Sequence, residues 1–296
     1  MIVVMGATGR TGRRVVEGLL RAGEQVRAIG RSEASLAALA RAGAEVRVGD
    51  SSDAGFLTEA FRGASAAYTL LPYDLRVEDY RTQQARMGEA VVTAVREGGV
   101  KHVVALSSVG ADQGVGTGPV DSLHAQEARL RTLTGVNVLV LRAGSFFENF
   151  FDVLPVIRHQ GVTADVVEPE RPVPMIATRD IADAAVTALR ARDWRGFVVR
   201  ELLGPRDLSY AEATRILGER IGQPGLPYVK LPPDDMAGAL VQGGFSEDLA
   251  RLYVELAQAI NDGRVRSLEG RTPANTTPTR FEDFADELAR AYAAMA

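Results

Sequence analysis

Three glycines near the start of the chain, Gly6, Gly9 and Gly12, have the spacing of a turn that binds the phosphates of a dinucleotide. They follow the short apolar run of residues 2–5 and precede apolar residues at helical spacing, so they join an expected strand to an expected helix. In that context Gly6 makes the tight turn, Gly9 lets a pyrophosphate approach the backbone, and Gly12 lets the helix pack on the strand. Free N–H groups at the helix start would then face the phosphates. The alternative is a glycine-rich loop that binds nothing. The predicted phosphate-binding residues are Gly6, Thr8, Gly9, Arg10, Thr11 and Gly12.

The position after the second expected strand, residues 25–29, indicates which dinucleotide is bound. An acidic residue there would bind the ribose 2′-hydroxyl of NAD, whereas an arginine accommodates the 2′-phosphate of NADP. The sequence has Arg31 there, and Arg10 in the glycine turn could reach the same phosphate. The planar guanidinium group suits this role because it binds phosphate oxygens in pairs. The two arginines predict NADP(H) as the cofactor, although each could instead be a solvated surface charge.

Further cofactor contacts are expected where the third, fourth and fifth strands end, because ligands of an open parallel sheet bind beyond the carboxyl ends of its strands. Asp50 could accept a hydrogen bond from an adenine amino group or could cap the next turn, and the sequence leaves both interpretations open. The fourth strand runs into Pro72, which we expect to form a lip over the cofactor. The cofactor-binding residues predicted at these strand ends are Asp50, Ser51, Leu70, Leu71, Pro72 and Ser107.

Composition excludes several classes of function. The chain has 296 residues, of which 46% are hydrophobic and 24% charged, as in ordinary globular proteins. A net charge of -4 predicts no general attraction to nucleic acid or to acidic membranes. The absence of cysteine excludes disulfides and thiol catalysis, and His102, His124 and His159 are too widely separated to suggest a zinc cluster, so no metal is expected. No signal peptide or membrane span is recognisable, so we expect a cytoplasmic protein that acts on a small molecule. The oligomeric state stays open, with a homodimer as one option.

Strands and helices alternate at intervals of roughly 20–30 residues, which is typical of an α/β fold with a doubly wound parallel sheet, the Rossmann fold. After about residue 150 the pattern loosens into prolines and further helices. We therefore expect a Rossmann domain over residues 1–150 and a small, mostly helical C-terminal lobe over residues 151–296. This lobe would hold the substrate, and some of its elements would return to the Rossmann domain. The expected strands span residues 2–5, 25–29, 44–48, 66–71, 103–106 and 137–142, and the later helices span residues 123–133, 179–190, 209–221, 246–260 and 280–294.

Four phenylalanines occupy six consecutive positions, residues 146–151, directly after the sixth expected strand. Beyond the carboxyl end of a strand they suggest a flat apolar wall for a substrate ring, although core packing must account for some of them. Asn149, between them, could form a hydrogen bond near the nicotinamide. The predicted substrate-binding residues are Phe146, Phe147, Asn149 and Phe150.

The motifs together resemble the NmrA-like group of atypical short-chain dehydrogenases/reductases, and within it the bacterial quinone oxidoreductases. The resemblance rests on the glycine turn, on Ser107-Ser108-Val109-Gly110, on His124-x-x-Glu127, and on Leu141-Arg142-x-Gly144-x-Phe146-x-Glu148-Asn149. It covers essentially the whole chain. It implies an NADP-binding Rossmann domain with a C-terminal lobe that completes the substrate cleft.

Conventional members of that superfamily carry Tyr-x-x-x-Lys, in which the tyrosine donates a proton. Aligned by its spacing to Gly135, this motif falls on residues 120–124, where Val120 replaces the tyrosine and His124 replaces the lysine. The resemblance therefore implies hydride transfer to a quinone or a similar flat electrophile, which needs less acid assistance than a carbonyl. His124 is the catalytic candidate, orienting or protonating the substrate. The equal alternative is a surface histidine on an amphipathic helix.

Two other functions stay open. A redox-sensing regulator of the NmrA type would bind NADP through the same fold without turnover. A biosynthetic enzyme would reduce an imine or an enone. The sequence has no long charge run or tail that could form a partner surface, which favours an enzyme.

Overall fold

A parallel sheet of seven strands forms the first part of the computed structural model, which describes residues 1–295. The strands are β1 (Ile2–Val4), β2 (Val26–Gly30), β3 (Glu45–Val48), β4 (Ala66–Thr69), β5 (His102–Ser108), β6 (Asn137–Ala143) and β10 (Phe197–Leu202). Their order in the sheet is β10-β6-β5-β4-β1-β2-β3. The strand order reverses direction between β1 and β4, which lie side by side. A ligand of such a sheet binds at the carboxyl ends of those two strands.

Two layers of helices cover the faces of this sheet. They are α1 (Arg10–Arg21), α2 (Glu33–Arg41) and α7 (Thr178–Ala191) on one face, and α3 (Ala54–Phe61), α4 (Tyr80–Glu97) and α5 (Val120–Arg131) on the other. Alternate residues of β1 supply both layers: Ile2 and Val4 pack toward α1, whereas Val3 packs toward α3 and α4. Strands that are buried on both faces read as continuous apolar runs, which explains the sequence of residues 2–5.

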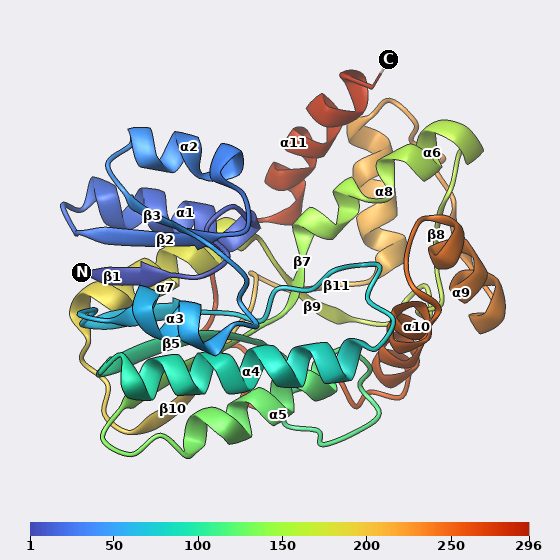
Figure 1. Cartoon of the computed structure of the whole chain (residues 1–296). Helices are drawn as coiled ribbons and strands as arrows, with labels where there is room; N and C mark the ends of the chain where they lie inside the picture. Colours follow the sequence, from blue (N-terminus) through green and yellow to red (C-terminus); the bar gives the residue numbers. More distant parts are fainter. Residues whose placement is uncertain (296) are drawn as a thin grey trace.

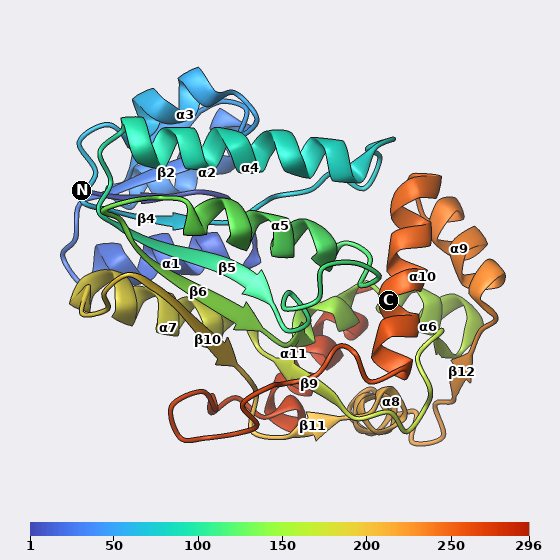
Figure 2. The same cartoon turned by 90° about the horizontal axis from the view of Figure 1, so that it is seen from below.

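The second part of the fold, here called the C-terminal lobe, lies beyond the carboxyl ends of the strands. Figure 1 shows it beside the sheet, and in Figure 2 the arrowheads of β5 and β6 point toward it. Its helices are α6 (Leu154–Gln160), α8 (Tyr210–Arg220), α9 (Pro233–Gln242), α10 (Glu247–Asn261) and α11 (Phe281–Ala293), with the 3₁₀ helix η1 (Phe147–Phe151). Its short strands are β7 (Ser145–Phe146), β8 (Thr163–Asp165), β9 (Val173–Ile176), β11 (Asp207–Leu208) and β12 (Tyr228–Lys230).

Residues 178–202 return from the C-terminal lobe to the sheet. Helix α7 packs against α1, and β10 pairs in parallel with β6 from Phe197↔Val138 to Leu202↔Ala143. The sequence pattern did not predict β10, α6, α9 or the short strands. It also placed the start of α5 at Leu123, three residues late, and ended β5 before Ser107, which lies within the strand. Among residues 1–295, none of the helices is long and apolar enough to span a bilayer.

Candidate cofactor and substrate site

The glycine turn between β1 and α1 is shaped by backbone contacts that exclude side chains. Gly6 has a φ of +58°, a conformation that favours glycine. A Cβ atom on Gly12 would lie 2.2 Å from the carbonyl oxygen of Gly6, so any other residue there must displace the turn. Gly9 is exposed, and a Cβ atom there would lie 3.3 Å from the same oxygen. The buried Thr11 accepts a hydrogen bond of 3.0 Å from Tyr68, which fixes the start of α1 against β4.

The start of α1 has the properties of an anion-binding helix terminus. Its N-cap, Gly9, makes no side-chain hydrogen bond to the helix, and the first turn contains no acidic residue. By contrast, Ser32, Asp53 and Asp79 cap α2, α3 and α4 with their side chains. The N–H groups of the first turn of α1 therefore remain available to a phosphate.

The two arginines predicted to bind the cofactor have different surroundings. Arg31 is exposed directly after β2, and its side chain makes no hydrogen bond or ion pair to any other residue of 1–295. Arg10 instead extends to the segment after β6, where Nη1 donates to Oδ1 of Asn149 at 3.2 Å and Nη2 lies 3.3 Å from Oδ1 of Asp152. The structure thus brings Arg10 and Asn149 into direct contact.

The remaining strand-end residues vary in what they can offer to a cofactor. Asp50 accepts a hydrogen bond of 2.8 Å from the N–H of Ser52, which favours the capping interpretation, and Ser51 is buried. Leu70 packs over Gly6 at the floor of the turn. The side chain of Leu71 is buried in the core under α3 and α4, so only its backbone could contact a cofactor. The carbonyl of Pro72 accepts a hydrogen bond of 3.1 Å from Gln84.

Ser107, near the end of β5, belongs to a buried network that sequence reasoning missed. Its hydroxyl donates a hydrogen bond of 2.6 Å to Oε1 of Glu127, on α5. Arg142, on β6, donates to both oxygens of Glu127, at 3.0 and 2.6 Å. Glu127 and Arg142 side chains are only 7% and 12% exposed, so this bidentate pair is largely removed from solvent. The only signal in the sequence was that both residues lie within motifs shared with the family.

His124 lies one turn before Glu127 on α5 and faces the loop after β5. Its Nδ1 is 2.9 Å from the carbonyl oxygen of Ala111, and because a carbonyl only accepts, Nδ1 carries the hydrogen. Nε2 points toward Gly114 and is the ring nitrogen left for a ligand. The hydrogen bond to Ala111 therefore holds the imidazole against this loop.

The predicted aromatic wall is wrong for two of its members. Phe147 and Phe150 are 1% and 5% exposed and pack against Phe281 of α11, with ring centroids 5.1 and 4.9 Å away. They form the core of the C-terminal lobe, because η1 folds under α11. Phe146, on β7, is only partly buried and packs at the edge of the sheet core, so it remains the member that could contact a substrate.

Two tyrosines that sequence reasoning missed meet beside Pro72. The hydroxyls of Tyr73 and Tyr253, the latter on α10, are 3.0 Å apart. Burial raises the pKa of Tyr253 well above its ordinary value, and Tyr73 adds to the effect. Tyr253 is therefore protonated at neutral pH, and either hydroxyl can be the donor in this pair. Tyr73 could have been noticed as the residue after the predicted lip, but nothing near Tyr253 in the sequence marks it.

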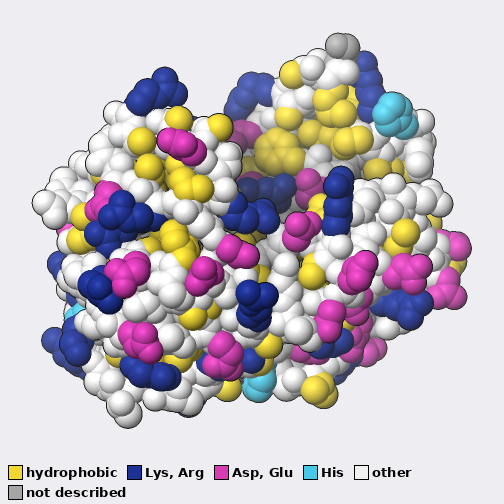
Figure 3. Space-filling view, in the orientation of Figure 1, with side chains coloured by type: hydrophobic (Ala, Val, Ile, Leu, Met, Phe, Trp, Pro, Cys, Tyr) yellow, Lys and Arg dark blue, Asp and Glu magenta, His cyan; other side chains and the backbone are white. Residues whose placement is uncertain are grey.

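A hollow separates the two parts of the molecule on the face shown in Figure 3. Lys and Arg side chains gather at its floor, and hydrophobic side chains form the wall beside α11. Among the described residues 1–295, no group of three His, Asp or Glu side chains is arranged to hold a metal ion. The arrangement suits a ligand that has an anionic part and an apolar part.

The sequence pattern that defines the NmrA-like family matches residues 1–285. The chain belongs to the NmrA-like family. A protein named NAD(P)H azoreductase, from Xenophilus azovorans, is 30% identical over 300 residues, which cover 99% of this chain and 100% of that one. A Streptomyces griseus protein named (4-alkanoyl-5-oxo-2,5-dihydrofuran-3-yl)methyl phosphate reductase is 28% identical over 302 residues and 99% of each chain. A solved structure of the NADPH-dependent quinone oxidoreductase QOR2 of Escherichia coli, complexed with NADPH, is also similar to this chain, with a TM-score of 0.83 between the two. The two chains are 25% identical, and the match covers 97% of this chain and 99% of that chain.

This NmrA-like chain has the residues that a dinucleotide phosphate requires. The exposed Gly9, which has no side chain, the uncapped start of α1 and the unpaired Arg31 all lie at the strand ends nearest the reversal of strand order. A pyrophosphate fits the first two features, and a 2′-phosphate fits the third.

Proposed function

We propose that this member of the NmrA-like family is an NADPH-dependent reductase that transfers hydride to a quinone or a similar flat electrophilic small molecule. The observation that carries the proposal is the uncapped glycine turn combined with Arg31 at the position that distinguishes the two dinucleotides. The names of the azoreductase and quinone oxidoreductase relatives support the same chemistry. A cytoplasmic location belongs to this proposal, and so does a substrate held between the sheet and the C-terminal lobe.

In this proposal the phosphates of the dinucleotide are bound by Gly9, the first turn of α1, Arg10 and Arg31. The bound nicotinamide supplies the hydride. Ser107 contributes an acceptor, because its proton is directed to Glu127 and its remaining lone pairs can accept a hydrogen bond from an amide or hydroxyl group.

Negative charge develops on a carbonyl oxygen of a quinone as it accepts hydride, and a hydrogen-bond donor stabilises it. The hydroxyls of Tyr73 and Tyr253 form a pair beside the predicted cofactor lip, and the one that does not donate to the other is free to donate to a ligand. His124 is the second candidate: Ala111 accepts from Nδ1, and Nε2 can donate to the substrate oxygen when the ring is an imidazolium. Phe146 would supply apolar contact to the ring.

The decisive experiment measures NADPH oxidation with a panel of quinones, azo dyes, enones and imines, with NADH in parallel. We expect turnover with at least one quinone. We expect His124→Ala to lower kcat by about a hundredfold, near the lower end of the effect of general acid catalysis, while NADPH affinity stays nearly unchanged. His159→Ala, on the exposed surface of α6, is the control and should behave as wild type. If quinone turnover is unchanged in His124→Ala but lost in Tyr73→Phe and Tyr253→Phe, the proton donor is one of the tyrosines and not the histidine.

Reduction of an enone is the second candidate, because the Streptomyces griseus relative is named as a reductase of an oxo-dihydrofuran. Turnover of enones without turnover of quinones would select it. Tight NADPH binding without turnover of any compound in the panel would contradict both enzymes and favour the redox-sensing regulator. Size-exclusion chromatography of the same preparation would decide whether the protein forms a homodimer.

A further inference from the structure

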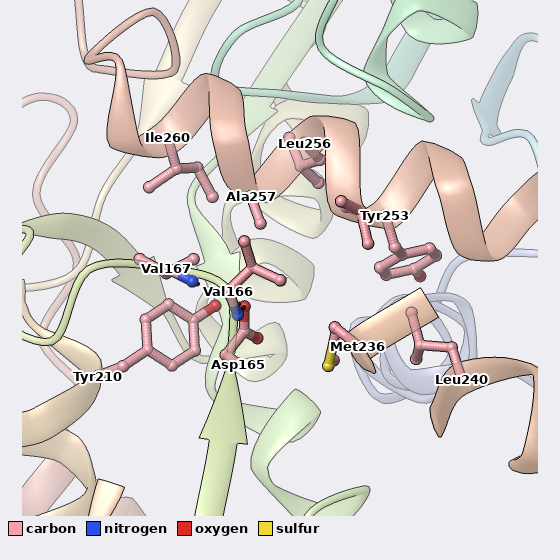
Figure 4. A pocket seen from close by; sticks show the side chains of 11 residues that line it. Asp165, Val166, Val167, Tyr210, Met236, Leu240, Tyr253, Leu256, Ala257 and Ile260 are labelled. Atoms are coloured by element: carbon pink, nitrogen blue, oxygen red, sulfur yellow. Dashed lines mark hydrogen bonds between the residues drawn. The ribbon is translucent and has the colours of Figure 1, made fainter. Parts of the chain in front are cut away.

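A cavity of about 60 Å³ lies inside the C-terminal lobe, between β8, α8, α9 and α10. Figure 4 shows that its walls are mostly apolar, with Met236 and Leu240 from α9 facing Leu256 and Ala257 from α10. One water molecule takes about 30 Å³ of liquid, so the cavity has room for a substituent of about two or three heavy atoms.

Asp165, at the end of β8, is the only carboxylate among the described residues that line this cavity. Its Oδ1 accepts two hydrogen bonds, from the N–H groups of Val166 at 2.7 Å and Val167 at 3.1 Å. No donor within residues 1–295 forms a hydrogen bond to Oδ2. Figure 4 shows the carboxylate between the ring of Tyr210 and the side chain of Met236. Burial raises the pKa of Asp165, and the two backbone hydrogen bonds oppose that shift.

The cavity is next to the candidate active site through Tyr253. This ring lines the cavity, and its hydroxyl meets Tyr73 beside the predicted cofactor lip. The charge of Asp152, which pairs with Arg10 of the glycine turn, also acts on Tyr253. Tyr253 is therefore the residue that the cavity and the candidate active site share.

We propose that this cavity is a substrate subsite that takes a small amino substituent carried on a flat aromatic body, with Oδ2 of Asp165 as acceptor. An amine satisfies the carboxylate oxygen with N–H groups, and an ammonium group also compensates its buried charge. The walls can adjust to the substituent because Met236 is flexible and polarisable. The inference rests on the proposed reductase function, since it extends the same substrate cleft.

The first test measures binding directly and needs no turnover. Methionine methyl groups labelled with ¹³C report on the cavity through Met236, whose signal is assigned by its loss in Met236→Leu, while the fully buried Met175 serves as reference. We expect benzylamine to shift the Met236 signal saturably and toluene to shift it weakly. Asp165→Asn keeps an oxygen for the two backbone N–H groups but turns an N–H₂ group toward the cavity. It should weaken benzylamine binding by about tenfold or more.

Two further variants keep this test decisive. Asp235→Asn, which removes an exposed charge next to Met236, should bind benzylamine as wild type does. Leu240→Phe fills the cavity without touching Asp165 and should abolish the shift even if Asp165→Asn folds poorly. The proposal is overturned if the Met236 signal does not respond to benzylamine, or if it responds equally in wild type and in Asp165→Asn. Either result would mean that the cavity is only a packing defect.

The second test compares kcat/KM for two quinones that differ only in an aminomethyl or an ethyl substituent. Wild type should prefer the aminomethyl compound by about tenfold, and Asp165→Asn should lose that preference, measured as the ratio of the two kcat/KM values. If no quinone is reduced but benzylamine still reaches Met236, the proposed function fails and the subsite stands. If both quinones are reduced equally by wild type and by Asp165→Asn, the subsite fails and the reductase stands.

Discussion

The hydroxyl of Ser107 donates its hydrogen to Glu127 across 2.6 Å, so the end of β5 offers the cleft an oxygen lone pair and not a proton. Glu127 can only accept, because it is also held by two hydrogen bonds from Arg142. The hydroxyl of Ser107 is therefore fixed in one role by a buried ion pair.

Glu127→Gln should destabilise the protein by about 3–5 kcal/mol, because it leaves the guanidinium of Arg142 buried without its partner. Removing both charges, in Glu127→Gln with Arg142→Met, should recover part of that loss. The measurement is the free energy of unfolding in urea. Glu89→Gln breaks the more exposed pair with Arg129 between α4 and α5 and should change stability by about 1 kcal/mol or less. Equal effects of Glu127→Gln and Glu89→Gln would contradict a special role for the buried pair.

Gly12→Ala should abolish or strongly weaken NADPH binding, because the new Cβ atom would lie 2.2 Å from the carbonyl oxygen of Gly6 and push the turn away from the phosphates. Gly238→Ala, in α9, is the matched control, since a Cβ atom there meets nothing within 4 Å. Calorimetric titration with NADPH measures both. A folded Gly12→Ala protein with wild-type affinity would remove the glycine turn from the cofactor site.

Arg31→Ala should reduce the preference for NADPH over NADH by roughly tenfold or more, the value of one charge-assisted contact to a phosphate. The effect should appear in the dissociation constant of NADPH and leave that of NADH nearly unchanged. Arg41→Ala, on the exposed last turn of α2, controls for the loss of one positive charge. If wild type binds both dinucleotides equally well, Arg31 is a surface charge.

Asp152→Asn should tighten NADPH binding by about twofold to fivefold. This is the range expected when an exposed ion pair no longer competes with a cofactor phosphate for Arg10. In the structure Arg10 pairs with Asp152 and Asn149, and both contacts must loosen before its guanidinium can turn to a phosphate. Titration with NADPH at low and high salt tests this, because the gain should shrink as salt screens the pair. A weaker affinity in Asp152→Asn would mean that the carboxylate helps to position Arg10.

The stability of Asp165→Asn relative to wild type should rise as the pH increases from about 4 to about 7. Burial raises the pKa of Asp165, so the folded protein holds that proton more tightly than the unfolded chain does. The protonated carboxyl of Asp165 stabilises the folded wild-type protein fully at a pH below the pKa that Asp165 has in the unfolded chain. This stabilisation is lost as the pH rises through the higher pKa that Asp165 has in the folded protein. Tyr210 and Tyr228, which face Asp165, do not titrate in this range because burial raises their pKa values too. Urea unfolding across this range measures the difference, and a flat profile would show that Asp165 ionises as freely in the folded state.

The elements that local sequence determines were predictable, and those that depend on distant partners were not. Strand β1 is visible because it is apolar throughout and ends at Gly6. Strand β10 carries Arg200 and Glu201 in its middle and becomes a strand by pairing with β6. Two-residue strands such as β7 and β11 have no pattern of their own.

The same distinction explains the candidate site. The cofactor residues lie in one local turn and at successive strand ends, where spacing alone identifies them. The burial of Phe147 depends on Phe281, which is far away in the sequence. The meeting of Tyr73 with Tyr253 and the cavity beside Asp165 likewise depend on how α10 packs, which no local pattern specifies.

The late position of β10 in the chain has a consequence for synthesis on the ribosome. Until it is made, β6 is an unpaired edge of a growing sheet, and such an edge can pair with another chain. Phe197, the first residue of β10, follows Ala143, the last residue of β6, by 54 positions in the chain. At a translation rate of about 5–20 residues per second, β6 therefore remains unpaired for roughly 3–11 s. During that interval α7 is also missing, and the core under α1 that Ile181, Ala185 and Leu189 will cover is exposed. Each newly made molecule therefore passes through a stage in which its own neighbours on a polysome could supply the missing strand.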